Sequence, residues 1–323
     1  MKLKIIEAHT MGEPLRFIID GIPEIKGITM LEKQNYFEKH YDQYRKGVLL
    51  EPYGHKDMFG AVLTSKINKE ADIGVLFMNT EGMERMCGHG SIAVSVIAAK
   101  YGLVKIKEPT TDIKLDVPAG IVTVTLEVRN GKVISASLQN VASHYISEES
   151  IDIGLKHFIT ADIAYGGNAF AIVNADNLGL LISPNNTSRI IQTGMKIKTV
   201  LNEKKKYKDK AILGTLLYSK NADNADYKDV VVFGNGSIDR SLCGTGCSAF
   251  ISMLRKKKRI ELHEEITVQS IVGTKFDVRI ISEYQENGML QCVPEIKGNA
   301  YIIGEGIRYF DENDPAKFGF LLR

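Results

Sequence analysis

The chain has 323 residues, of which 44% are hydrophobic and 25% charged, and its formal net charge is +2. This length suggests about two domains, each with enough apolar residues for a buried core. The small net charge gives no reason to expect nucleic acid as a partner, and no apolar run approaches the ~20 residues that span a bilayer. Four cysteines do not make a disulfide scaffold, and the start of the chain does not resemble a secretion signal, so we expect a cytoplasmic protein with reduced thiols.

The elements of the first half follow from apolar runs and turn signals. Residues 15–19 form a β-rich run, and a later strand is expected to end near Phe77. Residues 91–101 are almost entirely apolar, which predicts a buried helix. Asn130 and Gly131 lie between stretches that alternate apolar and polar residues, which predicts a β-hairpin.

The second half repeats this order. Residues 170–173 form a β-rich run, a strand is expected to end near Phe233, and residues 247–256 predict a second buried helix. We therefore expect an α/β (α+β) protein in which each half has a mixed sheet around one buried helix.

An internal repeat relates the two halves. The motif CGxGxxA occurs at residues 87–93 and again at 243–249, an offset of 243 − 87 = 156. At the same offset, three residues before the first motif match three before the second: Val75, Phe77 and Asn79 correspond to Val231, Phe233 and Asn235. Such ordered matches indicate a duplicated half and predict an approximate twofold axis. We expect the first domain at 1–126, completed by 297–323, and the second at 127–296.

Three explanations of the CGxG elements compete with catalysis. A cysteine before a glycine-rich turn can be a small core residue, but its recurrence at the start of both helices argues against this. Glu108 and Glu264 lie 20 residues after the first motif glycines, as in dinucleotide-binding sites. However, the expected strands end ten residues before the cysteines, too far for that fingerprint. Cys243 and Cys247 could form half of a metal site, but no second pair of ligands follows, so we expect no metal.

The remaining explanation is a pair of catalytic thiols. The start of a helix carries unpaired N–H groups and a partial positive charge, which favour a thiolate there. The glycines that follow allow backbone N–H groups to approach a carboxylate. A pseudo-twofold axis could place one thiol on each face of an α-carbon, where one would remove a proton and the other would deliver one. Two equivalent bases are what a racemase needs.

The sequence resembles the proline racemase family, which includes proline racemase, 4-hydroxyproline 2-epimerase and trans-3-hydroxyproline dehydratase. The motifs that carry the resemblance are HTMGEP at 9–14, EPYGHKDMFGA at 51–61, MCGHGSIA at 86–93 and DRSLCGTG at 239–246. The resemblance implies a fold similar to diaminopimelate epimerase, with the site in the cleft between two α/β halves. It also implies catalysis without a cofactor.

The resemblance assigns Cys87 and Cys243 as the acid/base pair. It implies that backbone N–H groups bind the substrate carboxylate at Gly88, His89, Gly244 and Thr245. The side chains of His89 and Asp239 would flank the ring nitrogen and the thiols, and Phe59 and Phe233 would wall the ring.

Four positions depart from the family's usual residues. Leu242 replaces a proline before the second cysteine, and Cys247 replaces a threonine. Tyr53 replaces an arginine, and Asn79 replaces a histidine. None of these changes removes a catalytic group, but the last three could alter the choice of substrate.

The sequence therefore predicts an isomerase that acts on a small molecule and interconverts L- and D-proline. The alternatives are 4-hydroxyproline 2-epimerase, trans-3-hydroxyproline dehydratase, or a protein that binds an amino acid or senses redox state without turnover. The dehydratases of this family carry threonine or serine at the first cysteine, so Cys87 favours racemisation. A homodimer is compatible with such an enzyme.

Overall fold

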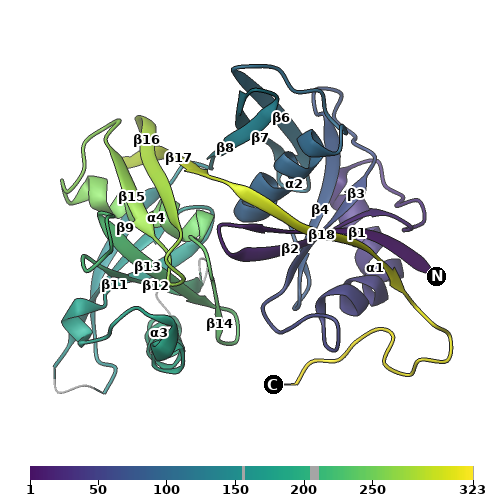
Figure 1. Ribbon diagram of the computed structural model, residues 1–323. Helices are drawn as coiled ribbons and strands as arrows, with labels where there is room; N and C mark the ends of the chain where they lie inside the picture. Colours follow the sequence, from purple (N-terminus) through teal and green to yellow (C-terminus); the bar gives the residue numbers. More distant parts are fainter. Residues whose placement is uncertain (155–156, 204–210, 323) are drawn as a thin grey trace. The chain divides into compact units, whose positions relative to one another are not determined.

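The computed structural model describes residues 1–154, 157–203 and 211–322. The chain divides into two compact units, Met1–Leu138 with Gly298–Arg323, and Gln139–Lys297 (Figure 1). The first unit extends beyond the boundary expected at residue 126, because strand β8 (Lys132–Gln139) forms a hairpin with β7 (Gly120–Arg129). The turn between them confirms the predicted hairpin, since Asn130 and Gly131 have φ of 53° and 69°.

The first unit is built on a mixed sheet with the strand order β18–β1–β2–β3–β4–β6–β7–β8. The β2–β3 and β4–β6 pairs are parallel, and the other neighbouring pairs in this order are antiparallel. The short strand β5 pairs with β4 just before the first CGxG motif. The remaining bounds are β1 (Lys2–Thr10), β2 (Glu13–Asp20), β3 (Phe59–Thr64), β4 (Ile73–Asn79), β5 (Met83–Glu84), β6 (Thr110–Val117) and β18 (Ala300–Tyr309).

The second unit has the same topology, with the strand order β9–β10–β11–β12–β13–β15–β16–β17. Its parallel pairs, β11–β12 and β13–β15, occupy the places of β2–β3 and β4–β6. The bounds are β9 (His144–Ile151), β10 (Ile159–Tyr165), β11 (Ala169–Asn174), β12 (Ile212–Ser219), β13 (Tyr227–Phe233), β14 (Ser237–Ile238), β15 (Glu265–Gln269), β16 (Lys275–Glu286) and β17 (Met289–Gly298). The matching strand orders support a duplicated half, and the mixed sheets confirm the expected fold class.

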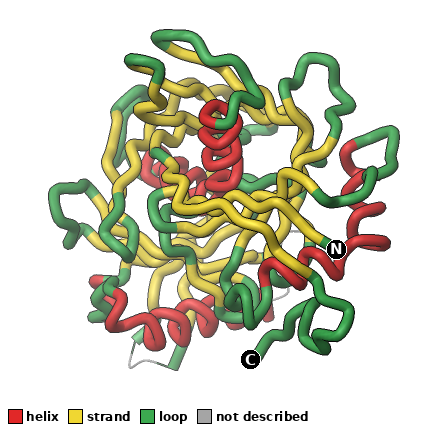
Figure 2. The backbone as a smooth tube through the Cα atoms, turned by 45° about the vertical axis from the view of Figure 1, so that its right-hand side comes forward, coloured by secondary structure: helices red, strands yellow, loops and turns green. Residues whose placement is uncertain are grey.

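One buried helix lies inside the sheet of each unit, as predicted. These are α2 (Gly88–Lys100) and α4 (Gly244–Lys256), each of 13 residues. Both contact several strands of their own unit, and Figure 2 shows helices enclosed by strands in this way. Each helix begins at the first glycine of its CGxG motif, three residues before the apolar stretch that predicted it.

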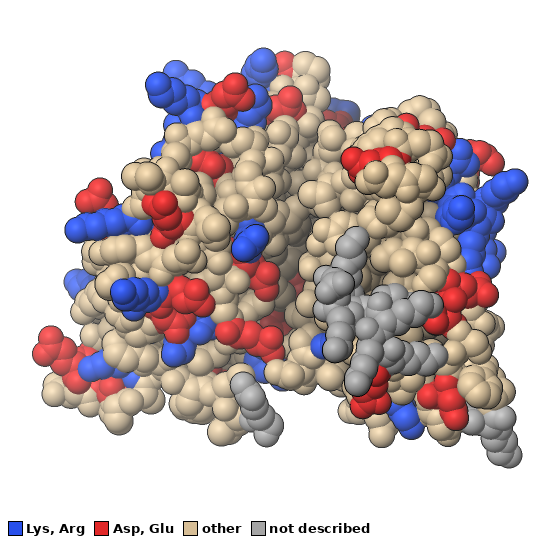
Figure 3. Space-filling view, turned by 180° about the vertical axis from the view of Figure 1, so that it is seen from behind, with Lys and Arg blue, Asp and Glu red and all other residues tan. Residues whose placement is uncertain are grey.

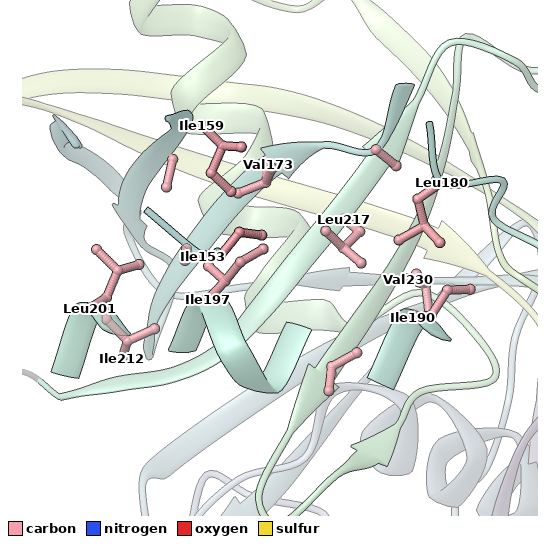
Figure 4. Close-up of a cluster of buried hydrophobic side chains, with 14 of the residues drawn as sticks. Ile153, Ile159, Val173, Leu180, Ile190, Ile197, Leu201, Ile212, Leu217 and Val230 are labelled. Carbon is pink, nitrogen blue, oxygen red and sulfur yellow. The ribbon is translucent and has the colours of Figure 1, made fainter. Parts of the chain in front are cut away.

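A second helix, which no apolar run in the sequence predicted, covers the outer face of each sheet. They are α1 (Met30–Leu49) and α3 (Thr187–Glu203), and α3 follows the short 3₁₀ helices η1 (Asp176–Leu178) and η2 (Pro184–Asn186). The buried side of α3 carries Ile190, Gly194, Ile197 and Leu201, one residue every three to four positions. Figure 4 shows Ile190, Ile197 and Leu201 packed against strand residues such as Leu217 and Val230.

On the face in Figure 3, basic and acidic side chains are interspersed on both units. Within the described residues, no helix is long and apolar enough to cross a bilayer. The same residues contain no group of three or more His, Cys, Asp and Glu side chains that could hold a metal ion.

Candidate functional site

In the first unit, Cys87 is the N-cap residue of α2. Its backbone is extended, with φ −139° and ψ 117°, and its side chain is 8% exposed. The first hydrogen bond of the helix runs from the Ser91 N–H to the Cys87 carbonyl, at 2.9 Å. The N–H groups of Gly88, His89 and Gly90 precede that bond, so they point out of the helix start beside the thiol. This is the arrangement that a carboxylate-binding turn needs.

His89 lies beside the Cys87 thiol. Its Nδ1 and Nε2 are 3.5 and 3.7 Å from Cys87 Sγ, and its ring packs edge-to-face on Phe59 with the centroids 4.6 Å apart. Protein surrounds most of the imidazole, and this burial lowers the pKa of His89 to about 3. The histidine is therefore neutral at physiological pH and can exchange a hydrogen bond with the thiol. The first unit thus brings together its four expected site residues: Cys87, Gly88, His89 and Phe59.

In the second unit, Cys243 is the N-cap residue of α4. The Cys247 N–H donates to the Cys243 carbonyl at 2.7 Å, and the Gly246 N–H donates to Cys243 Sγ at 3.4 Å. The Thr245 hydroxyl is 3.6 Å from the same sulfur. The helix start, as expected from the sequence, and the Thr245 hydroxyl, which was not expected to do so, both favour a negative charge on this sulfur.

The surroundings of Cys243 as a whole nevertheless disfavour its thiolate, which is the opposite of what the sequence led us to expect. Burial and the nearby Asp239 carboxylate, which is hydrogen-bonded to the thiol, raise the pKa of Cys243 well above its usual value. The donors Thr245 and Gly246 lower that pKa by less. Asp239 is 7% exposed, so its charge is poorly screened. Cys243 is therefore a neutral thiol, not the thiolate that the sequence led us to expect.

Each helix start rests directly on a strand of its own sheet, and this contact requires the second glycine of CGxG. A Cβ atom on Gly90 would lie 2.8 Å from a ring carbon of Phe77, and one on Gly246 would lie 3.0 Å from Val231 Cγ2. Phe77 on β4 and Val231 on β13 therefore occupy equivalent places beneath the two cysteines. The glycines allow strand and helix to approach closely.

This equivalence corrects the gapless repeat inferred from the sequence. The helices are related by an offset of 156, from Gly88 to Gly244, whereas β4 and β13 are related by 227 − 73 = 154. The loop between strand and cysteine is thus two residues longer in the second unit. Phe77 corresponds to Val231 rather than to Phe233, and the counterpart of Phe233 is Asn79.

The two expected ring walls, Phe59 and Phe233, are therefore not symmetry mates. Phe59 on β3 pairs with Asn79 on β4, whereas Gly214 on β12 pairs with Phe233 on β13. The Phe59 ring lies beside the helix start of the first unit, against His89, whereas Phe233 belongs to a strand that is not the counterpart of β3. A Cβ atom on Gly214 would lie 3.1 Å from Phe233 Cβ, so the glycine leaves room for that ring. The two units thus differ at both aligned positions: Phe59 corresponds to Gly214, and Asn79 to Phe233.

The four residues that depart from the family pattern lie either away from the two helix starts or buried behind them. Leu242 and Cys247 are buried, at 3% and 0% exposure. The Tyr53 ring lies against the guanidinium of Arg16, and its hydroxyl donates to Glu7. In the turn after β4, the side-chain oxygen Oδ1 of Asn79 accepts hydrogen bonds from the N–H groups of Glu81 and Gly82, and its Nδ2 donates to Glu84 at 2.7 Å.

Sequence reasoning missed three residues that hold the helix starts. The Thr10 hydroxyl donates to the His89 carbonyl at 2.7 Å, and Asn140 Nδ2 lies 3.3 Å from the Gly244 carbonyl. Gly166 packs against the first turn of α4. A signal existed for two of them. Gly12 and Gly167 are separated by 155 residues, close to the offset of the repeat, and Thr10 and Gly166 lie within two residues of these glycines. Asn140 lies in neither copy of any motif.

Replacing Gly166 by alanine is expected to destabilise the second unit. The added Cβ would lie 2.3 Å from the Thr245 carbonyl oxygen and 2.5 Å from the Ala249 nitrogen, and backbone atoms cannot rotate away. Overpacking of this kind costs about 1–3 kcal/mol or more, which urea unfolding would measure. Gly306→Ala is the control, because a Cβ there meets no atom within 4 Å. Equal stability of the two variants would contradict this account of α4.

Known proteins with similar sequences cover the whole chain. Residues 5–321 match the family model described as proline racemase. The chain is 40% identical to the proline racemase of Acetoanaerobium sticklandii, over 98% of this chain and 97% of the relative. It is 34% identical to a trans-3-hydroxy-L-proline dehydratase of Colwellia psychrerythraea, over 100% and 93% of the two chains.

A solved structure agrees with these matches. A hydroxyproline epimerase from Agrobacterium vitis, with trans-4-hydroxy-L-proline bound, superimposes with a TM-score of 0.84 at 26% identity. The superposition covers 99% of this chain and 95% of that structure. With the two CGxG helix starts and a family match from residue 5 to residue 321, the chain belongs to the proline racemase family.

Proposed function

We propose that this protein is an isomerase that interconverts L- and D-proline without a cofactor, with Cys87 and Cys243 exchanging the α-proton. The observation that carries the proposal is the matched position of the two cysteines. Each is the N-cap of a buried helix of 13 residues, and each lies beside backbone N–H groups that precede the first bond of its helix. The relatives named proline racemase support the choice of reaction. The proposal includes a cytoplasmic location, where four free cysteines stay reduced.

In the proposed reaction, N–H groups at the two helix starts bind the substrate carboxylate. The donors are Gly88, His89, Gly244 and Thr245, whose partial positive charge suits an anion. The mechanism requires one thiol on each face of the α-carbon. One cysteine, as the thiolate, takes the α-proton, and the electron pair left on the carbon spreads into the carboxylate. The other cysteine, as the thiol, donates its proton to the opposite face, so the product is the enantiomer and the protonation states of the two sulfurs have exchanged.

The surroundings of the two sulfurs suggest different resting states. Burial and Asp239 raise the pKa of Cys243, which suits it to donate a proton first. His89, which is neutral and 3.5 Å from Cys87 Sγ, can accept a hydrogen bond from that thiol or donate one to its thiolate. We therefore propose that the resting enzyme converts the enantiomer from which Cys87 removes the α-proton, while Cys243 donates a proton. In the complex, Asp239 would accept a hydrogen bond from the ring nitrogen of the substrate.

A second candidate, 4-hydroxyproline 2-epimerase, is favoured by the epimerase structure with bound trans-4-hydroxy-L-proline. That epimerase would use the same two thiols, and it would differ from a proline racemase only in the residues that contact the substrate ring. Phe59 and Phe233 offer no hydrogen-bonding group to a hydroxyl, and the Asn79 amide is already hydrogen-bonded within its turn. These features support proline as the substrate.

Proline is expected to be turned over more efficiently than trans-4-hydroxyproline. Burying a hydroxyl without a partner costs about 1–3 kcal/mol, which is roughly five- to 150-fold in kcat/KM. Phe233→Ser should narrow this ratio by placing a hydroxyl beside the ring, and Phe233→Leu is the apolar control. Polarimetry with both substrates measures the ratio. A wild-type protein that prefers 4-hydroxyproline would make the epimerase the correct assignment.

The decisive experiment follows the α-proton. The protein is incubated with L-proline in deuterated water without added cofactor, and the optical rotation and the deuterium content of the α-carbon are recorded. We expect the rotation to fall to zero and the α-carbon to become deuterated. Binding of proline without either change would overturn the proposal and favour an amino-acid-binding protein.

A further inference from the structure

The first turn of each thiol-bearing helix is held by one buried side chain from outside the helix. In the first unit this is Thr10, the last residue of β1, whose hydroxyl donates to the His89 carbonyl at 2.7 Å. In the second unit it is Asn140, which lies between β8 and β9. Asn140 Nδ2 donates to Ser248 Oγ at 2.8 Å and reaches the Gly244 carbonyl at 3.3 Å. Ser248 Oγ in turn donates to the Gly244 carbonyl at 2.7 Å.

These hydrogen bonds hold the first turns of the two helices, and groups in those turns surround the two sulfur atoms. His89 is bonded through its carbonyl to Thr10, and its ring lies 3.5 Å from Cys87 Sγ. Gly244 begins the turn in which the Gly246 N–H donates to Cys243 Sγ at 3.4 Å. A hydrogen bond donated by a backbone N–H to sulfur weakens steeply as the turn that carries the N–H rotates away. The orientation of each first turn thus controls how well its thiolate is stabilised.

The burial of Asn140 suggests a role beyond stability. Its side chain is 4% exposed, and its Oδ1 has no hydrogen-bond partner among the described residues. A buried polar atom without a partner costs about 1–3 kcal/mol, so an apolar residue of the same shape would be as stable or more stable here. The one property that only the asparagine supplies is its donated N–H. Thr10 is 0% exposed and its hydroxyl likewise donates to the helix.

We propose that Thr10 and Asn140 are positioning residues, each of which orients the first helical turn of its own unit against that unit's cysteine and so sets the reactivity of the thiol. This inference rests on the proposed function only in taking the two thiols as the reacting groups.

The test is the pH dependence of iodoacetamide labelling, followed for each cysteine by peptide mass spectrometry on the full chain. Thr10→Val keeps the shape of the side chain and removes the donor, and Asn140→Leu does the same. We expect Thr10→Val to slow the labelling of Cys87 roughly three- to tenfold at a fixed pH below its midpoint, equivalent to about half to one pKa unit. Cys243 should be unaffected. Asn140→Leu should instead slow the labelling of Cys243 and leave that of Cys87 unaffected.

Matched controls separate positioning from general loosening. Thr111→Val removes another buried hydroxyl of the first unit, one that bonds to Lys107 instead of to a helix. Ser143→Ala removes one in the second unit that donates to the Cys292 carbonyl. Both controls should leave the two labelling profiles unchanged, and Thr10→Ser should restore the profile of Cys87. Slower labelling of both cysteines in either variant, or profiles identical to the controls, would overturn the proposal.

This readout is independent of turnover. If the wild-type protein racemises proline, each variant should lower kcat/KM, since the turns that carry the thiols also carry the N–H groups proposed to bind the carboxylate. If it does not, the proposed function fails, while the selectivity of labelling still decides whether Thr10 and Asn140 position the thiols.

Discussion

Serine in place of Cys87 or of Cys243 is expected to lower the rate of proline racemisation by about 10²–10⁴-fold, the usual contribution of a positioned acid or base. A serine hydroxyl has the size of the thiol but is a far poorer base at neutral pH. Each thiol has to act once in every turnover, as acceptor or as donor. The two single variants should therefore be about equally impaired, and the double variant should be little worse than either. Loss of optical rotation measures the rate.

Cys247→Ala is the control for this experiment. Cys247 lies one turn inside α4, is 0% exposed, and its pKa is raised well above the usual value by burial and by Asp229. It should be neutral and out of reach of substrate, so the variant should keep its activity. An inactive Cys247→Ala beside an active Cys243→Ser would refute the assignment of the acid/base pair. Full activity in both Cys87→Ser and Cys243→Ser would refute the two-thiol mechanism.

The helix starts could be predicted from sequence because their chemistry is local. Within seven residues, CGxGxxA contains the N-cap, the glycine on which a strand packs, and the first apolar residues of a buried helix. The outer helices carry no such signal. In α1, apolar core residues such as Phe37 and Val48 are separated by charged and polar residues, so no apolar run marks the helix. The only sign of these outer helices in the sequence is the helical spacing of the residues that are buried.

Other features of the site depend on contacts that one sequence does not reveal. The repeat could be found from the motif, but its gap between strand and cysteine is visible only in the pairing of Phe59 with Asn79 and of Gly214 with Phe233. The charge state of Cys243 depends on Asp239 and on burial together, and motif reasoning weighed only the helix start. Asn140 reaches the turn of Gly244 from 104 residues away in sequence. Long-range packing of this kind decides reactivity without leaving a local pattern.

A second large effect concerns stability and involves Asp229 on β13, beneath α4. Its carboxyl is 1% exposed, its Oδ2 has no hydrogen-bond partner among the described residues, and burial raises its pKa to about 7. The folded protein therefore holds this proton more tightly than the unfolded chain, in which the usual value of 3.8 applies. Between pH 4 and pH 7 the unfolded chain ionises while the folded protein stays protonated. Stability attributable to this group is complete below pH 4 and falls as the pH rises to 7.

Asp229→Asn should remove this dependence, because asparagine has the shape of the protonated acid and does not ionise. We expect the variant to match the wild type near pH 4 and to exceed its free energy of unfolding by about 4 kcal/mol at pH 7 and above, from 1.36 kcal/mol per pKa unit. Other groups also change stability with pH, so the quantity to plot is the difference between the two proteins in urea unfolding at each pH. Asp20→Asn, at an exposed carboxylate, should give a difference that stays flat. A difference that is equally flat for Asp229→Asn would mean that this buried carboxyl is stabilised as an anion in the folded protein.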